Sequence, residues 1–263
     1  MGIKMKICSW NINSIRLRES QVLRLLRDEC PDVICFQECK SLVENIPQKS
    51  FYDLGYSHMA ARGQKSYNGV ATFSKIPISK EFSIDFADLG QARHIAVCLE
   101  NGFTVHNFYV PAGGDEPNME TNLKFAQKIN FLNAMKEWFI SNTPKKAILV
   151  GDLNIAPDED DVWDHKKLLK VVSHTPLEID KLLEVKKSGD WIDVFRKNKP
   201  NGKLYSWWSY RSKDWSLADK GRRLDHIWVT SDLKEMNFKN LVLRDVRGWD
   251  KPSDHAPIIS VLG

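Results

Sequence analysis

The sequence has no apolar run that approaches the roughly 20 residues of a membrane-spanning helix. Its first residues, Met1 to Cys8, lead directly into a strand pattern and lack the hydrophobic segment of a signal peptide. We therefore expect a soluble, cytoplasmic protein with no membrane partner.

Cysteine is scarce and shows no paired spacing. The five cysteines, Cys8, Cys30, Cys35, Cys39 and Cys98, are odd in number and lie mostly within apolar stretches. They lack the spacing and the histidine partners of a zinc site. The pattern predicts reduced thiols in the core and argues against a disulfide scaffold.

A strong net charge is also absent, because 38 Lys and Arg face 34 Asp and Glu. Composition does not change along the 263 residues, which predicts one domain over residues 1–263. Basic residues nevertheless gather between Arg196 and Arg223, interleaved with Tyr and Trp. Such a mixture can neutralise phosphates and stack on bases. A solvated basic loop beside core aromatics explains this segment equally well.

Short apolar runs bounded by turn residues predict strands at 5–12, 32–37, 56–61, 69–75, 93–100, 103–110, 147–153, 204–210, 224–230, 240–246 and 256–262. Helical spacing predicts helices at 17–29, 119–140 and about 176–187, the last with Thr175 as N-cap and Gly189 as its stop. This order favours an α/β fold in which two packed β-sheets are covered by helices.

Polar residues stand at the ends of these predicted strands. Asp152 and Asn154 follow a buried strand two residues apart and so share a face. A carboxylate beside an amide can hold and orient a water, which is what phosphoryl transfer needs. An ordinary turn at a strand end gives the same tetrapeptide.

Glu38 and Asn11 end two other predicted strands. Mg²⁺ prefers one or two carboxylates and retains waters, so Glu38 suits a magnesium site that Asn11 approaches. Taken singly, each side chain is better explained as a polar residue at a strand end whose hydrogen bonds are satisfied by the backbone.

Asp254 and His255 precede the last predicted strand and face opposite ways in extended chain. Asp225 is the natural carboxylate partner for the imidazole of His255, which would act as a base or as a phosphate clamp. The hydroxyl of Tyr109, at another strand end, can donate to a phosphate oxygen. Asp193 ends a further run, whereas His226 is expected to be structural and the acidic run 158–161 to be a solvated face.

Seven segments in series resemble the exonuclease III family of abasic-site endonucleases within the endonuclease/exonuclease/phosphatase superfamily. They are Trp10-Asn11-Ile12-Asn13, Gln37-Glu38-Cys39-Lys40, Tyr67-Asn68-Gly69-Val70-Ala71, Gly151-Asp152-Leu153-Asn154, Trp207-Trp208-Ser209-Tyr210-Arg211, Arg223-Leu224-Asp225-His226 and Ser253-Asp254-His255-Ala256-Pro257. The resemblance runs from about residue 5 to residue 262 and keeps the family's order.

This resemblance implies a four-layer sandwich and a Mg²⁺-dependent hydrolase, with Mn²⁺ able to substitute. The implied substrate is double-stranded DNA, cut 5′ to abasic sites or trimmed at blocked 3′ ends, by an enzyme expected to be monomeric. The implied metal ligands are Asn11, Glu38, Asp152, Asn154, Asp254 and His255. The implied catalytic residues are Tyr109, Asp152, Asn154, Asp225 and His255, and the implied DNA contacts are Arg93, Trp207, Arg211 and Leu224.

The chain departs from the family pattern at two positions. Arg222 stands where some relatives carry an apolar or aromatic pocket residue, and His226 replaces a common tyrosine. The balance between incision at abasic sites and trimming of 3′ ends therefore stays open. A phosphatase of small phosphoesters and an inactive DNA-binding module are the alternative functions.

Overall fold

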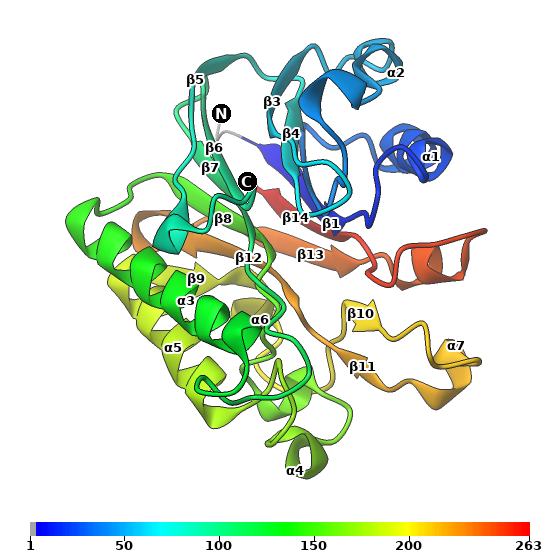
Figure 1. Ribbon diagram of the computed structural model, residues 1–263. Coiled ribbons are helices and arrows are strands. Elements are labelled where there is room, and N and C mark those ends of the chain that lie inside the picture. The colour runs from blue at the N-terminus through cyan, green and yellow to red at the C-terminus, as the bar shows by residue number, and fades with distance from the viewer. Residues whose placement is uncertain (1–3) are drawn as a thin grey trace.

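Two six-stranded sheets pack face to face, and helices cover their outer faces (Figure 1). The computed structural model describes residues 4–263. Within the sheets, β1 pairs with β2 and β7 with β8 in parallel, whereas the other neighbours are antiparallel. The predicted four-layer sandwich of two mixed sheets is confirmed.

The first sheet has the order β13 (Phe238–Val242), β14 (Ile258–Leu262), β1 (Met5–Asn11), β2 (Val33–Gln37), β4 (Val70–Ser74) and β3 (His58–Arg62). The second has the order β5 (Ile78–Phe82), β6 (His94–Leu99), β7 (Thr104–Tyr109), β8 (Ala147–Asp152), β12 (Asp225–Thr230) and β9 (Trp191–Asp193). A small ribbon pairs β10 (Trp207–Trp208) with β11 (Gly221–Arg222).

The helices are α1 (Glu19–Glu29), α2 (Gln48–Tyr52), α3 (Leu123–Ser141), α4 (His165–Leu168), α5 (Pro176–Ser188), α6 (Val194–Asn198) and α7 (Trp215–Ala218). Short 3-10 turns are η1 (Val43–Asn45), η2 (Phe86–Asp88), η3 (Glu159–Asp161), η4 (Ser231–Leu233) and η5 (Arg244–Gly248). No helix within residues 4–263 has the length and apolar character needed to cross a membrane.

Three apolar clusters hold the layers together. The cluster between the sheets includes Ile7, Val97 and Val150, all fully buried. A second lies under α3 and α5, and a third lies under α1 and α2. Strands buried on both faces read as continuous apolar runs, which is why β2 and β8 were predictable from sequence.

The predicted cap of α5 is confirmed. The Thr175 side chain accepts from the backbone N–H of Glu178, and the Glu178 carboxylate accepts from the backbone N–H of Thr175, which makes a capping box. Pro176 occupies the first turn and Gly189 ends the helix.

Two strand predictions were wrong in extent. The run 204–210 is extended only at Trp207–Trp208, because its neighbour β11 is itself two residues long. The run 240–246 stops being a strand at Val242, where pairing with Ile258 at the start of β14 ends, and η5 follows. Three strands were missed: β5 is a largely exposed edge strand, and β9 and β11 are too short to show a period.

Candidate active site

Strand register places several predicted site residues side by side at the ends of neighbouring strands in the second sheet. Asp152 at the end of β8 lies opposite Tyr109 of β7 on one side and Asp225 of β12 on the other. In the first sheet, Asn11 at the end of β1 lies opposite Gln37, so Glu38 follows at the same edge. Segments distant in sequence therefore meet where the two sheets end.

The backbone bends sharply at these strand ends. Glu38 and Asn154 adopt left-handed conformations with φ of 49° and 53°, which are uncommon for residues with a side chain. Gly151 has φ 141°, and a Cβ there would stand 1.9 Å from the carbonyl oxygen of Phe108. Only glycine lets β8 approach β7 closely enough to place Asp152.

Glu38 lies at the centre of the first group of contacts. Its Oε1 accepts from the Tyr109 hydroxyl at 2.5 Å and from Asn11 Nδ2 at 3.2 Å, while Lys40 Nζ lies 2.8 Å from Oε2. Burial would raise the pKa of Glu38, but Lys40 and Tyr109 outweigh it and the pKa is lowered. The carboxylate is therefore ionised.

Asp152 connects the contacts around Glu38 to the pair formed by His255 and Asp225. Its Oδ2 accepts from Asn11 Nδ2 at 2.8 Å, and its Oδ1 accepts from the backbone N–H of Asn154 at 2.9 Å. His255 Nε2 lies 3.6 Å from Oδ2. Burial, reinforced by Asp225 and opposed by His255, raises the pKa of Asp152 to about 7. Such a carboxyl can take up and release a proton near neutral pH.

His255 and Asp225 form the buried pair that the sequence predicted. His255 Nδ1 lies 2.8 Å from Asp225 Oδ2, which also accepts from the Ser206 hydroxyl at 2.6 Å. Burial would lower the pKa of His255, but Asp225 and Asp152 raise it to about 10. The imidazole therefore carries a positive charge at neutral pH.

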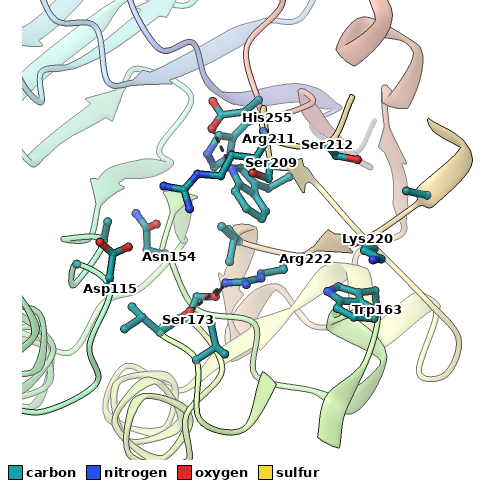
Figure 2. A pocket seen from close by; sticks show the side chains of 18 of the residues that line it. Asp115, Asn154, Trp163, Ser173, Ser209, Arg211, Ser212, Lys220, Arg222 and His255 are labelled. Carbon is teal, nitrogen blue, oxygen red and sulfur yellow. Dashed lines mark hydrogen bonds between the residues drawn. The ribbon is translucent and has the colours of Figure 1, made fainter. Parts of the chain in front are cut away.

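A cavity of about 740 Å³ opens beside these groups (Figure 2). Glu38, Asn154, Asp254 and His255 line it, as do three of the four predicted DNA contacts, Trp207, Arg211 and Leu224. Trp207 Nε1 donates to Asp254 Oδ2 at 2.9 Å, and Asn13 donates to the other oxygen at 3.2 Å. The cavity therefore joins the acidic groups to an aromatic and basic wall.

The fourth predicted DNA contact, Arg93, lies beside Tyr109. Its guanidinium stands 4.7 Å from the centre of the Tyr109 ring, and Nη1 donates to the Tyr109 carbonyl at 3.2 Å. The Tyr109 hydroxyl, which was expected to face a phosphate, donates to Glu38. Both side chains thus belong to the Glu38 group of contacts.

The donor set fits a hard divalent cation. Asp152, Asp225 and His255 each offer a ligand atom within 4.8 Å of the others. The charged His255, however, already stands as a cation between two carboxylates, and its ring has no lone pair to offer while it is protonated. Oxygen donors remain at Glu38 and Asp254, and Asp225 Oδ1 is buried with no hydrogen-bond partner among residues 4–263. Oxygen ligands of this kind suit Mg²⁺.

Several predictions outside the site are corrected or confirmed. Asp193 does not join the site: its carboxylate caps α6 and lies 2.6 Å from Arg223. The run 158–161 is not simply a solvated face, because Asp161 is buried and pairs with Arg223 and Arg196. His226 is structural, as predicted, with Nε2 2.9 Å from the Ile155 carbonyl.

The cysteine prediction holds for most of the thiols. All five are free; Cys8, Cys35 and Cys39 are buried, while Cys30 is exposed. Burial raises the pKa of Cys35 to about 12, so this thiol stays protonated at neutral pH.

Sequence reasoning missed three residues that support the site. Ser206 holds Asp225, and Lys40 pairs with Glu38. Lys128 is fully buried and donates to the carbonyl of Asn154 at 2.8 Å and to Glu178. The spacing from Phe125 to Ile129 already placed Lys128 on the buried face of its helix, and a lysine there was the available signal.

Comparison with known proteins places this chain in a family of nucleases and phosphatases. The model of the Endonuclease/Exonuclease/phosphatase family matches residues 8–255. Exodeoxyribonuclease III of Haemophilus influenzae is 35% identical over 97% of this chain and 98% of that protein. Exodeoxyribonuclease of Bacillus subtilis is 30% identical over 98% of this chain and 99% of that protein.

Solved structures of DNA-processing enzymes have the same fold as this chain. An AP endonuclease from Archaeoglobus fulgidus superimposes with a TM-score of 0.91 at 30% identity, covering 98% of this chain and 99% of that one. The 3′ phosphatase NExo from Neisseria, bound to product DNA hairpin, gives 0.90 at 29% identity with the same coverage.

Fold and site together define a hydrolase of the nuclease type. More particularly, the chain belongs to the Endonuclease/Exonuclease/phosphatase family, whose enzymes depend on a metal ion, and its relatives within that family include exodeoxyribonuclease III.

Proposed function

We propose that this protein is a DNA-repair phosphodiesterase that cuts the backbone 5′ to abasic sites, trims blocked 3′ ends, or does both. The observation that carries the proposal is the position of Asp152. Its carboxyl, with a pKa raised to about 7, touches Asn11 and Asn154 and lies near His255, beside a cavity walled by Trp207 and Arg211. The similarity to exodeoxyribonucleases and an AP endonuclease supports the same function.

We assign the metal site to Mg²⁺, with Mn²⁺ able to substitute. Glu38 and Asp254 would hold the ion through carboxylate oxygens, with Asn11, Asp152 and Asn154 next to it. His255 is the weakest of the predicted ligands because of its charge. When bound, the ion neutralises negative charge on the phosphate as the bond breaks.

The protein's own groups account for the remaining chemistry. Asp152 takes the proton of the attacking water, which the Asn154 amide orients, as the water oxygen bonds to phosphorus. The bond between phosphorus and the 3′ oxygen breaks, and the leaving 3′ oxygen takes a proton from solvent. The imidazolium of His255, fixed by Asp225, donates to a phosphate oxygen and stabilises its charge. The Tyr109 hydroxyl, which donates to Glu38 at 2.5 Å, would donate to the same phosphate once substrate displaces that contact.

Duplex DNA would lie across the cavity. Arg93 and Arg211 would neutralise phosphates, while Trp207 and Leu224 would contact a sugar turned out of the helix. We expect a monomer that folds as one domain over residues 1–263 and acts on the chromosome inside the cell.

The test is a side-by-side assay of three duplexes: one with an abasic-site analogue, one with a 3′-phosphate and one with an unmodified 3′ end. Purified protein is assayed with Mg²⁺ and with EDTA. We expect magnesium-dependent cleavage of at least one of these duplexes. Intact DNA at excess enzyme, with cleavage of a small phosphoester that duplex DNA fails to inhibit, would instead indicate a phosphatase of small phosphoesters.

A further inference from the structure

The two sides of the cavity differ in their charged groups. One side holds the carboxylates Glu38 and Asp254 together with the cations His255 and Arg211, and the other side holds the cations Arg222 and Lys220 (Figure 2). Figure 2 shows Arg222 between Ser173 and Trp163, across the cavity from His255. The remaining carboxylate on the wall, Asp115, is exposed on the loop after β7.

Arg222 forms no ion pair with a carboxylate in the part of the chain that the structure describes. By contrast, Arg196, Arg223 and Arg244 all form ion pairs with aspartates. Among residues 4–263, neither Arg222 nor Lys220 forms one. Arg222 Nε is buried, and its N–H has no hydrogen-bond acceptor among the described residues. The positive charge of this guanidinium is therefore not compensated by an anion, although the group lies on a cavity wall that an anion could reach.

The side chain of Arg222 is nevertheless held in place. Its Nη1 donates to the carbonyl of Val172 at 2.9 Å and to the hydroxyl of Ser173 at 2.7 Å, the contact dashed in Figure 2. The backbone N–H of Ser173 is in turn fixed by Glu178 at 2.9 Å. The Trp207 ring lies 5.3 Å from the guanidinium carbon. Arg222 is therefore a preorganised part of the wall.

This arrangement distinguishes charged from neutral occupants of the cavity. Burial lowers the pKa of Arg222, and Glu178 opposes that effect. An arginine remains protonated at neutral pH, so the cost of removing water from its charge persists. An anion in the cavity would offset that cost, whereas a neutral deoxyribose would not.

We propose that Arg222 makes this side of the cavity a subsite for a negatively charged group at a DNA 3′ end. The occupant is a terminal phosphate oxygen, or a carboxylate attached to the 3′-phosphate as in a phosphoglycolate end. Arg222 then favours anionic 3′ ends over abasic sites. The inference rests on the proposed function, since it assumes that the scissile phosphate lies beside Asp152 and His255.

The experiment compares kcat/KM on four duplexes, which carry a 3′-phosphate, a 3′-phosphoglycolate, an internal abasic-site analogue or an unmodified 3′-hydroxyl. Wild type is compared with Arg222→Met and Arg222→Lys. Lys213→Met is the matched control, because Lys213 is an exposed cation of the same segment that does not line the cavity. Thermal unfolding of each variant reports its folding.

Loss of a charged hydrogen bond predicts that Arg222→Met lowers the ratio of anionic-end activity to abasic-site activity by roughly tenfold to a hundredfold. Arg222→Lys keeps most of that ratio, and Lys213→Met changes all substrates by the same factor. The larger loss on phosphoglycolate or on phosphate identifies the group bound. An equal fall on all four duplexes in a folded Arg222→Met variant would overturn the inference and leave the proposed function intact. Wild type inactive on all four would refute the proposed function itself.

Discussion

Two buried charge clusters lie beside the start of β12, and they differ in whether their charges balance. The site cluster consists of Asp152, Asp225 and His255, and the paired cluster consists of Asp161 and Asp193 with Arg196 and Arg223, beside His226. Asp225 and His226 are neighbours on one strand, and adjacent strand residues face opposite ways. On β12, Asp225 therefore belongs to the site cluster, and the next residue, His226, lies beside the paired cluster.

Charge compensation explains the different behaviour of their aspartates. In the paired cluster, burial would raise the pKa of Asp161, but Arg223 and Arg196 hold it below its ordinary value. In the site cluster one imidazolium faces two carboxylates, and burial raises the pKa of Asp152 to about 7. A balanced cluster stabilises the fold, and an unbalanced cluster keeps a group ready to exchange a proton.

The largest expected effect is on catalysis. Asp152→Asn should lower kcat by about 10²–10⁴-fold, because an amide cannot accept the proton of the attacking water. Duplex binding, measured by fluorescence anisotropy, should change little. Asp180→Asn, on the exposed side of α5, is the matched control. Near-normal activity of Asp152→Asn would remove Asp152 from the reaction.

Breaking the paired cluster should lower the stability of the fold. Arg223→Met leaves Asp161 and Asp193 buried without their main cation, which should lower the free energy of unfolding by about 3–5 kcal/mol. Urea denaturation measures the loss. Arg244→Met, which breaks a half-exposed pair with Asp219, should cost about 1 kcal/mol or less. Equal losses for both variants would contradict the contrast between the clusters.

The pH dependence of stability separates the clusters further. In EDTA, the folded protein retains a proton on Asp152 up to about pH 7, whereas the ordinary value is 3.8. The Asp152 contribution to wild-type stability therefore falls as the pH rises between these values, by up to about 1.4 kcal/mol per pH unit. Asp161, whose pKa is lowered, adds little slope above about pH 5, because it is ionised there in both the folded and the unfolded state.

Asp152→Asn cannot titrate, so its stability relative to wild type should increase with pH across this window. Urea denaturation at several pH values gives the comparison. A constant difference between the two proteins would show that Asp152 ionises normally in the fold.

The smallest effect tests the support of the site cluster. The Ser206 hydroxyl donates to Asp225 and accepts from the backbone N–H groups of Leu224 and Asp225. Ser206→Ala should lower kcat/KM by about fivefold, as expected for one lost hydrogen bond. Ser79→Ala on the edge strand β5 is the control. If both variants keep full activity, Ser206 does not help to hold Asp225.

Local sequence features were sufficient for much of the fold. Continuous apolar runs located β2 and β8, and Thr175 with Gly189 bounded α5. Strands without such a run, β5 and β9, were not predictable, because their positions are fixed by neighbours. The extent of β13 likewise depended on where β14 begins.

The candidate site was likewise predictable from the sequence only in part. Asp152, Asn154 and Glu38 were identifiable because they end buried strands, and the family resemblance added the remaining residues. Ser206 and Lys128 were missed because their partners are distant in the chain. Lys40 stands in the Gln37-Glu38-Cys39-Lys40 segment, but nothing in that segment showed that its ammonium pairs with the Glu38 carboxylate. Asp193 looked no different in sequence from the carboxylates of the site, and Asp161 looked like part of a solvated acidic run although it is buried.

The sequence by itself determined the two-sheet architecture, the polar residues at strand ends and the family. Only the tertiary structure decided which carboxylates are balanced by a buried arginine and which are left facing a cavity, because charge compensation depends on contacts between segments that sequence spacing does not encode. The same holds for Arg222, whose missing partner becomes visible only when the cavity is formed.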